Sequence, residues 1–295
     1  MSAIHGVPLS KTKTKHRVSG FVSKLEGQIA IVTGAGRGVG RATAIMLAKD
    51  GARLVVNDLD PNVAAETASL IQQSGHEAAV VMGSVTDSDF PSRLLHGALD
   101  AYGSIDIIVN NAGYIWNGAM HNHSDEQFQA MLDVHLSAPF RILREFSSWL
   151  RPQVNKEIGV GGQAKCRKVV NISSVSGTTG SATQIAYSAA KAGVIGLTKT
   201  LAKEWGRYNV TVNCVAFGPI ETRLTQPYSD APPTIDVGGR EFKVGLSERQ
   251  IEGLAATSPL GRTGKPDDAA GAVYLFCIPE SNFVTGEVLT CSGGL

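Results

Sequence analysis

The sequence predicts a single doubly wound α/β domain in which a seven-stranded parallel sheet carries helices on both faces. From Gln28 onward, short runs rich in β-branched residues alternate with longer segments of helical periodicity, the order that builds such a sheet. The 295 residues, 43% hydrophobic and 18% charged, are enough to bury one large core. The expected strands are residues 29–33, 53–57, 77–82, 105–110, 168–173, 210–215 and 287–291. The expected helices lie near residues 39–50, 61–74, 87–102, 125–150, 184–206 and 266–278.

Two segments depart from this alternation. Residues 151–168 are rich in Gly and Lys and lengthen the connection into the fifth strand, and residues 219–264, rich in Pro and Gly, follow the sixth strand. Ligands bind at the carboxyl ends of the strands in open α/β sheets, so we expect residues 219–264 to form a substrate lid. A plain surface excursion is the alternative.

The net charge of +1 is unevenly distributed. Residues 1–25 hold five basic side chains and no acidic one, which leaves the rest of the chain slightly acidic and argues against a nucleic-acid surface. We expect residues 1–25 to be a disordered tail and residues 26–295 to be the folded domain. A transit peptide that targets an organelle is the alternative for this tail.

The cysteines and the hydropathy pattern indicate the setting of the protein. The four cysteines are scattered without the spacing of a zinc site or a disulfide framework, so no metal is expected. No run approaches the roughly 18 apolar residues of a membrane span. A cytoplasmic, reducing location is therefore expected.

A glycine-rich turn follows the first expected strand. Gly34, Gly38 and Gly40 allow a tight turn and a close backbone approach, and the next helix offers free N–H groups to a pyrophosphate. Asp58 closes the second expected strand 18 residues after Gly40. This conjunction predicts a dinucleotide site of the Rossmann type.

Asp58 also bears on the choice of cofactor. A carboxylate at this position accepts a hydrogen bond from the ribose 2′-hydroxyl of NAD and repels the phosphate that replaces that hydroxyl in NADP. NAD is therefore the expected cofactor. Arg37, in the glycine turn, keeps NADP open as the alternative, because a guanidinium pairs well with a 2′-phosphate.

Tyr187 and Lys191 stand four positions apart in the helical stretch "AYSAAKAGVIGLTK". That spacing places both side chains on one helix face, where a lysine cation favours the phenolate and lowers the tyrosine pKa below its usual value of about 10. A tyrosine tuned in this way is a usable acid or base near neutral pH. Alone, the pair is also compatible with a surface tyrosine packed along a lysine stem.

With the glycine turn and this pair both in place, the sequence resembles the short-chain dehydrogenase/reductase family, most of all its 3-oxoacyl-thioester-reductase-type members. The likeness runs from Leu25 to Leu295. The matching motifs are T-G-x-x-x-G-x-G at residues 33–40, N-N-A-G at 110–113, "NISSVSG" at 171–177, Y-x-x-x-K at 187–191 and the closing "PLGRTGKPDDAAGAVYLF" and "TGEVLTCSGG". The resemblance implies an NAD(P)-dependent oxidoreductase that interconverts a secondary alcohol and a ketone. A nucleotide-binding regulatory or scaffold protein without catalysis is the alternative.

The resemblance also implies roles for individual residues. Tyr187 transfers the proton of the substrate oxygen, Ser174 hydrogen-bonds that oxygen, and Lys191 lowers the tyrosine pKa and holds the nicotinamide ribose. Such groups suit the chemistry, because hydride transfer to a ketone leaves charge on oxygen that an acid must quench. The cofactor-binding residues that the resemblance implies are Thr33, Gly34, Arg37, Gly38, Val39, Gly40, Asp58, Asn111, Ala112, Gly113, Tyr187, Lys191 and Thr222.

His135 departs from the family pattern. Family members usually carry an asparagine there, which helps to hold a water joined to the lysine in a proton relay. The imidazole is either a relay member or a buried structural group, and both interpretations stay open.

The substrate and the assembly are predicted only in outline. By resemblance, Tyr114, Trp116 and Phe217 form an apolar, aromatic wall of the substrate site, which suits a hydrophobic alcohol or ketone. An acyl thioester, a steroid or terpenoid alcohol and a polyketide ketone all fit this description. The resemblance further implies a homotetramer or homodimer built through the helices near residues 125–150 and 184–206.

Overall fold

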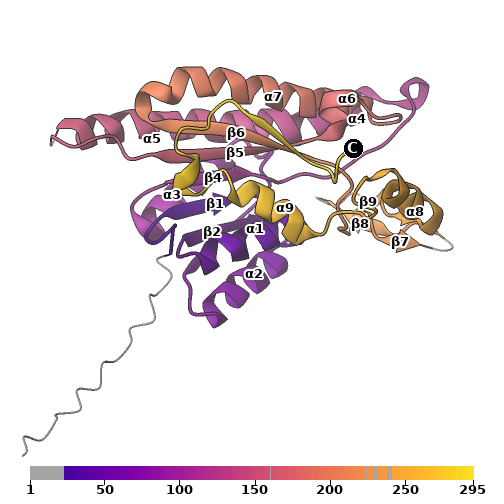
Figure 1. The fold of residues 1–295 in the computed structure, drawn as a ribbon, viewed down its shortest axis with the longest axis horizontal. Coiled ribbons are helices and arrows are strands. Elements are labelled where there is room, and N and C mark those ends of the chain that lie inside the picture. Colours follow the sequence, from indigo (N-terminus) through magenta and orange to yellow (C-terminus); the bar gives the residue numbers. More distant parts are fainter. Residues whose placement is uncertain (1–22, 160, 224, 229–230, 238, 240) are drawn as a thin grey trace, which may run out of the picture.

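The sheet contains seven parallel strands in the order β11-β6-β5-β4-β1-β2-β3, as predicted (Figure 1). The computed structural model describes residues 23–159, 161–223, 225–228, 231–237, 239 and 241–295. The strands are β1 (Ile29–Val32), β2 (Arg53–Asp58), β3 (Ala78–Met82), β4 (Ile107–Asn110), β5 (Arg167–Ser174), β6 (Val210–Phe217) and β11 (Val288–Cys291). β1 pairs with both β2 and β4, so the strand order reverses there, and ligands of doubly wound sheets bind at that switch point.

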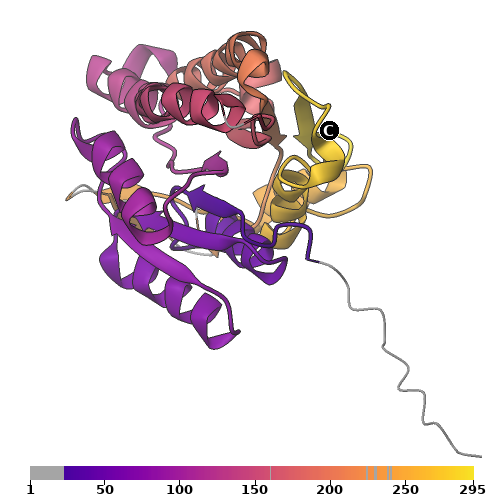
Figure 2. The same cartoon turned by 90° about the vertical axis from the view of Figure 1, so that its left-hand side faces the viewer.

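Helices cover both faces of the sheet, as the two views in Figures 1 and 2 show. α1 (Gly38–Lys49), α2 (Pro61–Gln73) and α9 (Pro266–Tyr274) contribute to one buried cluster, and α3 (Phe90–Tyr102), α5 (Ala138–Gly159) and α7 (Ile185–Trp205) to the other. Every residue of β1, β4 and β5 is buried, because each central strand is covered from both sides. The shorter helices are α4 (Asp125–Leu132), α6 (Val175–Thr179), η1 (Met120–Asn122), η3 (Gly206–Tyr208) and η4 (Pro279–Ser281).

The helix predicted near residues 125–150 is interrupted. α4 begins at a capping box on Ser124, and the π-helical turn η2 (Asp133–Ser137) connects it to α5. π-turns cost hydrogen-bond geometry and occur often at functional sites. This one carries His135.

The segment 151–168 differs from the expected loop, because α5 continues through Pro152 to Gly159. Tertiary contacts hold this extension. Val154 is buried, and the Glu157 carboxylate accepts hydrogen bonds from the guanidinium of Arg167, which is itself buried at the start of β5. The Arg167 guanidinium also lies 5.3 Å from the centroid of the Trp149 ring.

The segment 219–264, called the lid segment below, stands beside the sheet at the end where β6 stops (Figure 1). It contains α8 (Glu248–Thr257) and two two-stranded ladders of two and three residues per strand. The ladders are formed by β7 (Pro227–Tyr228) with β10 (Leu246–Ser247), and by β8 (Thr234–Asp236) with β9 (Glu241–Lys243).

The chain enters the fold beside α1. Leu25 is buried and its N–H donates to Asp50 O at 3.0 Å, and Lys24 pairs with Glu280 at 2.7 Å. The folded unit therefore includes these last two residues of the predicted tail, whose residues 1–22 lie outside the described part. Within the described ranges, no helix combines the length and apolar character needed to cross a bilayer.

Candidate functional site

Ser174, Tyr187 and Lys191 are brought together where β5 ends and α7 begins. Ser174 is the last residue of β5, and its Oγ accepts from the Ser176 N–H at 3.1 Å, which caps α6. Tyr187 stands on the first turn of α7, close enough for the Ser174 hydroxyl to act on its pKa. Lys191, one turn later, donates from Nζ to Ile172 O at 2.7 Å, and Nζ lies 5.6 Å from the centroid of the Tyr187 ring.

Burial dominates the acidity of this group. It raises the pKa of Tyr187 to about 12, against the opposing hydrogen bond from Ser174, and it lowers the pKa of Lys191 to about 8. The expected lowering of the tyrosine pKa is therefore wrong for this arrangement, in which the ammonium bonds a carbonyl and lies over the ring. At neutral pH, Tyr187 carries its proton.

His135 lies against Tyr187, with ring centroids 5.0 Å apart and planes at 89°. The π-turn holds the imidazole in the core, where only 4% of the residue is exposed. Its Nε2 is 2.7 Å from Tyr114 O, and a carbonyl only accepts, so Nε2 carries the hydrogen and Nδ1 is an acceptor. Nδ1 has no hydrogen-bond partner among the described residues. Burial, reinforced by the Lys191 charge, holds the His135 pKa well below its usual value, so the ring is neutral.

The glycine turn has the close approaches that a pyrophosphate cradle needs. A Cβ on Gly34, whose φ is 62°, would lie 2.7 Å from Ala112 Cα, and one on Gly40 would overlap Gly34 O. Gly38, Val39 and Gly40 form the first turn of α1, whose N-terminus has no side-chain cap. These N–H groups therefore remain available to a phosphate, and the turn fits a dinucleotide.

The N-N-A-G segment is bonded to the glycine turn. The Thr33 hydroxyl accepts from the N–H groups of Asn111 and Ala112 at 3.0 and 3.1 Å. The Asn111 amide donates to Thr33 O at 2.9 Å and to Gly34 O at 3.1 Å. These bonds align the ends of β1 and β4 at the switch point, where the cofactor of such folds lies.

The predicted adenosine corner contains two acidic and two basic groups. The Asp58 carboxylate accepts from the Gly36 N–H at 2.9 Å and from the Asp60 N–H at 3.1 Å, so it faces the glycine turn. Arg37 pairs with Asp60 at 3.3 Å. Burial lowers the pKa of Arg223, and the charges of Arg37, Asp58 and Asp60 act on it, so the lid segment contributes a second guanidinium to this corner. Sequence reasoning missed Arg223, which belongs to no motif.

The three aromatic residues predicted for the substrate wall do not form one cluster. Tyr114 and Trp116 both pack against Phe242 of the lid segment, which sequence reasoning missed. Phe217 ends β6 beside Ser174 in register, but it packs against the cluster on the α1 and α9 face. A polar network was also missed: the Ser176 hydroxyl contacts Ser181 Oγ and Gln184 Oε1, both at 2.8 Å.

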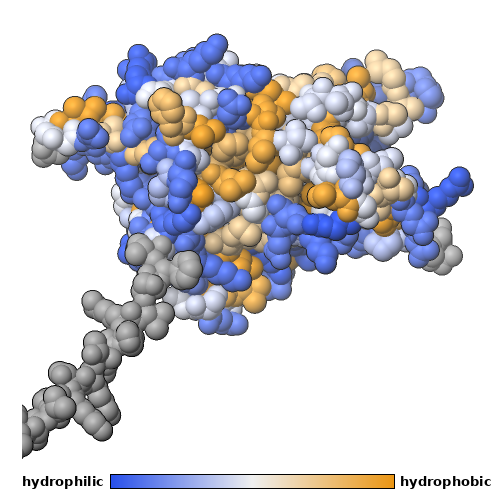
Figure 3. Space-filling model, in the orientation of Figure 1, coloured by the Kyte–Doolittle hydropathy of each residue, from blue (hydrophilic) through white to orange (hydrophobic). Residues whose placement is uncertain are grey.

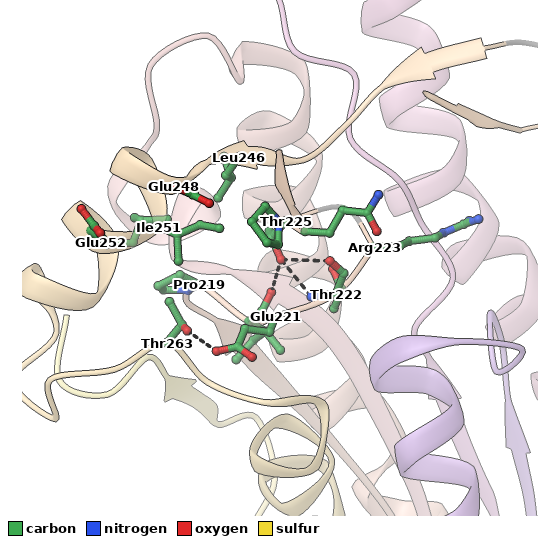
Figure 4. Close-up of a pocket in the computed structure, with 14 residues that line it drawn as sticks. Pro219, Glu221, Thr222, Arg223, Thr225, Leu246, Glu248, Ile251, Glu252 and Thr263 are labelled. Carbon is green, nitrogen blue, oxygen red and sulfur yellow. Dashed lines mark hydrogen bonds between the residues drawn. The ribbon is translucent and has the colours of Figure 1, made fainter. Parts of the chain in front are cut away.

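A pocket of about 660 Å³ lies between the chain that leaves β6 and helix α8 (Figure 4). Ile220, Leu246, Ile251 and Leu254 supply its apolar lining, and Glu221, Glu248 and Glu252 are among its charged residues. Thr222 lines it as well, and its methyl group would lie 3.6 Å from a Cβ on Gly38. The pocket therefore adjoins the glycine turn through Thr222.

The comparison with known families decides the class of protein. The family model for short chain dehydrogenases matches residues 28–233, which span both the glycine turn and the Tyr187–Lys191 pair. The chain belongs to the short-chain dehydrogenase family. It is therefore an oxidoreductase that uses a nicotinamide cofactor.

Relatives of this short-chain dehydrogenase are similar along nearly their whole length. A 3-oxoacyl-[acyl-carrier-protein] reductase from Synechocystis is 34% identical over 276 residues, 93% of this chain and 99% of the relative. The Vibrio cholerae reductase of the same name is 34% identical over 92% of this chain and 98% of its own. The crystal structure of a putative gluconate dehydrogenase from Agrobacterium tumefaciens has a TM-score of 0.75 at 30% identity, covering 92% of this chain and 97% of that one.

Proposed function

We propose that this protein reduces hydrophobic ketones to secondary alcohols, and catalyses the reverse reaction, with Ser174, Tyr187 and Lys191 at its centre. The observation that carries the proposal is that Tyr187 lies next to both Ser174 and Lys191, which are buried, beside a turn that fits a dinucleotide. The nicotinamide cofactor donates or accepts the hydride when bound. The protein must orient the carbonyl group and transfer one proton to or from the substrate oxygen.

The Ser174 hydroxyl is suited to orient the substrate oxygen. Its Oγ already accepts from the Ser176 N–H, so its proton is free to be donated to Tyr187 or to a carbonyl oxygen. Tyr187 then delivers its proton to that oxygen as negative charge develops. A phenol that is protonated at neutral pH favours this reductive direction.

We propose His135 as the replacement for the family's relay asparagine. Its neutral Nδ1 is a buried acceptor close enough to Lys191 for the lysine charge to act on it, which supports a water held between the two. The purely structural interpretation is supported by the bond to Tyr114 O and by the contact with Gly113, where a Cβ would overlap the ring. Variants of His135 distinguish the two, as the Discussion describes.

NAD is the proposed cofactor, with NADP as the alternative. The orientation of the Asp58 carboxylate toward the glycine turn supports NAD, because a 2′-phosphate there would meet its charge. Arg37 and Arg223 support NADP, since two guanidinium groups act on the same corner.

The proposed substrate is a hydrophobic ketone or alcohol, a class that includes the 3-oxoacyl thioesters named for the relatives. Tyr114 and Trp116 support an apolar wall, and residues 219–264 are proposed as the lid over it. A cytoplasmic location is proposed as well, on the ground that all four cysteines are free thiols.

We propose a homo-oligomer built through the two long helices. Phe128 and Phe140 are exposed on α4 and α5, and Ile185 is exposed on α7, which supports a contact surface there. Figure 3 shows further hydrophobic side chains gathered on the face that carries α9 and the C-terminal segment. A second contact on that face fits a tetramer better than a dimer.

Turnover of NADH, NADPH, NAD and NADP against a panel of hydrophobic ketones and alcohols tests the proposal. Cofactor-dependent turnover of a ketone that disappears in Tyr187→Phe is the expected result. Cofactor binding without turnover of any substrate in the panel would instead favour a protein that kept the fold and lost catalysis.

A further inference from the structure

Phe242 of β9 occupies the space between the two aromatic residues of the substrate wall. Its ring centroid lies 4.9 Å from that of Tyr114, with the planes tilted by 46°, and 4.9 Å from that of Trp116, with the planes at 77°. Only 5% of Phe242 is exposed, although it stands in a short surface strand. The wall therefore holds a six-membered aromatic ring in one tilted and one edge-on contact, and edge-on contacts are a geometry that aromatic pairs prefer.

This occupied space is joined to the catalytic group by two contacts. Tyr114 O accepts from His135 Nε2 at 2.7 Å, and the His135 ring lies 5.0 Å from the Tyr187 ring. A ring between Tyr114 and Trp116 is thus held by the same loop that supports Tyr187 through His135. The position belongs to the substrate side of the site.

The lid segment is built so that Phe242 can leave without disturbing the core. Phe242 and Val244 belong to neither main core: they form a small cluster of their own, which meets one core only through Tyr114 and Trp116. Helix α8 has no buried residue, and its apolar side chains Ile251 and Leu254 face the pocket of about 660 Å³. Segments with few buried apolar contacts open at low cost in free energy.

We propose that Phe242 is an internal stand-in for the substrate, and that the site accepts an aryl-bearing ketone or alcohol whose ring takes the place of the Phe242 ring. The inference rests on the proposed function and narrows its substrate class. An unbranched alkyl chain fills the same apolar space, but it lacks the two ring contacts that orient an aryl group. Because Phe242 competes for the position, removing its ring frees the site.

Binding and turnover of a phenyl ketone, acetophenone, and of a straight-chain methyl ketone with the same number of carbon atoms test this inference. Wild-type protein is expected to bind acetophenone roughly tenfold more tightly than the straight-chain ketone, the ratio that two aromatic contacts support. In calorimetric titrations, Phe242→Ala should bind acetophenone about tenfold more tightly than wild-type protein does. Phe242→Leu keeps the buried apolar contact, so its affinity for acetophenone should fall between those of wild-type protein and Phe242→Ala. Trp116→Ala should abolish the preference for acetophenone over the straight-chain ketone.

Ile158→Ala serves as the matched control, because it removes an exposed apolar side chain at the end of α5, away from the lid segment (Figure 1). Weaker acetophenone binding in a folded Phe242→Ala protein would overturn the inference, since Phe242 would then be a roof over the substrate rather than its competitor. Equal binding of the two ketones by wild-type protein would also overturn it. Binding is measured without turnover, so a wild-type protein that binds acetophenone as expected but reduces no ketone contradicts the proposed function alone.

Discussion

At the scale of single residues, His135 and Gly113 fit each other. A Cβ at position 113 would overlap the imidazole, so the glycine of N-N-A-G makes room for a side chain that family members usually lack. The neutral ring donates one hydrogen bond from Nε2 and presents Nδ1 as an acceptor without a partner among the described residues. A purely structural histidine has no need of this acceptor, whereas a relay histidine uses it to hold a water.

His135→Asn is expected to keep most of the turnover, because an amide retains a polar group where the relay water is proposed. His135→Leu should lose at least about tenfold, since no acceptor remains. Both variants should lose about 1 to 3 kcal/mol of stability as the bond to Tyr114 O is disturbed. Turnover per folded molecule and melting temperature measure the two effects, and full turnover in folded His135→Leu would remove His135 from the mechanism.

Asp58→Ala tests the cofactor preference. Loss of the carboxylate removes the charge that repels a 2′-phosphate, so NADPH affinity should rise relative to NADH by roughly tenfold. Fluorescence titration with each reduced cofactor measures the ratio, and Asp125→Ala, on the distant first turn of α4, is the control. Wild-type protein that already prefers NADPH would contradict this interpretation and make Arg37 and Arg223 the residues that determine specificity.

At the scale of elements, an ion pair between Glu157 and Arg167 is one of the contacts that hold the extension of α5. The Arg167 hydrogen bonds hold the Glu157 pKa at about 2, below its usual 4.5. A lowered carboxyl pKa stabilises the fold fully above about pH 4.5, and this contribution is lost as the pH falls toward 2.

Glu157→Gln should therefore lower the free energy of unfolding by about 3 kcal/mol at pH 7, because the Arg167 guanidinium stays buried without its counter-charge. Urea unfolding at pH 7 and at pH 3 measures this difference, which should shrink at the lower pH. The exposed neighbour Lys156→Gln is the control. A Glu157→Gln protein as stable as the control would show that the ion pair does not hold the extension.

The sequence predicts each strand of the main sheet to within two residues, because each strand has a core of consecutive β-branched and other apolar residues between segments of helical periodicity. It does not predict the π-turn, since periodicity cannot register one extra residue in a helix turn. Nor does it predict α5 beyond Pro152 or the ladders of the lid segment. Arg167 holds the α5 extension, and Tyr114 and Trp116 hold the lid segment. These contacts join residues far apart in the sequence, so no local sequence pattern predicts them.

The site divides in the same way. The glycine turn, Ser174, Tyr187 and Lys191 belong to motifs with fixed spacing, so the sequence predicts that they meet. Phe242 and Arg223 reach the site from an irregular segment whose path depends on tertiary contacts. The sequence also could not predict the pKa of Tyr187, because this pKa depends on burial and on which group accepts the hydrogen bond of Lys191 Nζ.

At the scale of the whole molecule, exposed aromatic side chains on the long helices predict assembly. Phe140, 45% exposed on α5, is the most direct probe, and Phe140→Arg should shift the protein toward smaller species. Light scattering coupled to size-exclusion chromatography measures the mass, with the exposed Ile158→Arg on the same helix as the control. If the Phe140→Arg protein had the same mass as the wild-type assembly, this helix face would be excluded as the interface.

The central claim is that Tyr187 delivers the proton from a buried phenol, and Tyr187→Phe tests it most directly, because the ring and its packing against His135 stay in place. We expect turnover with the preferred ketone and cofactor to fall at least about a hundredfold, while NADH affinity changes little. A folded Tyr187→Phe protein that keeps more than about a tenth of the wild-type turnover would contradict this role.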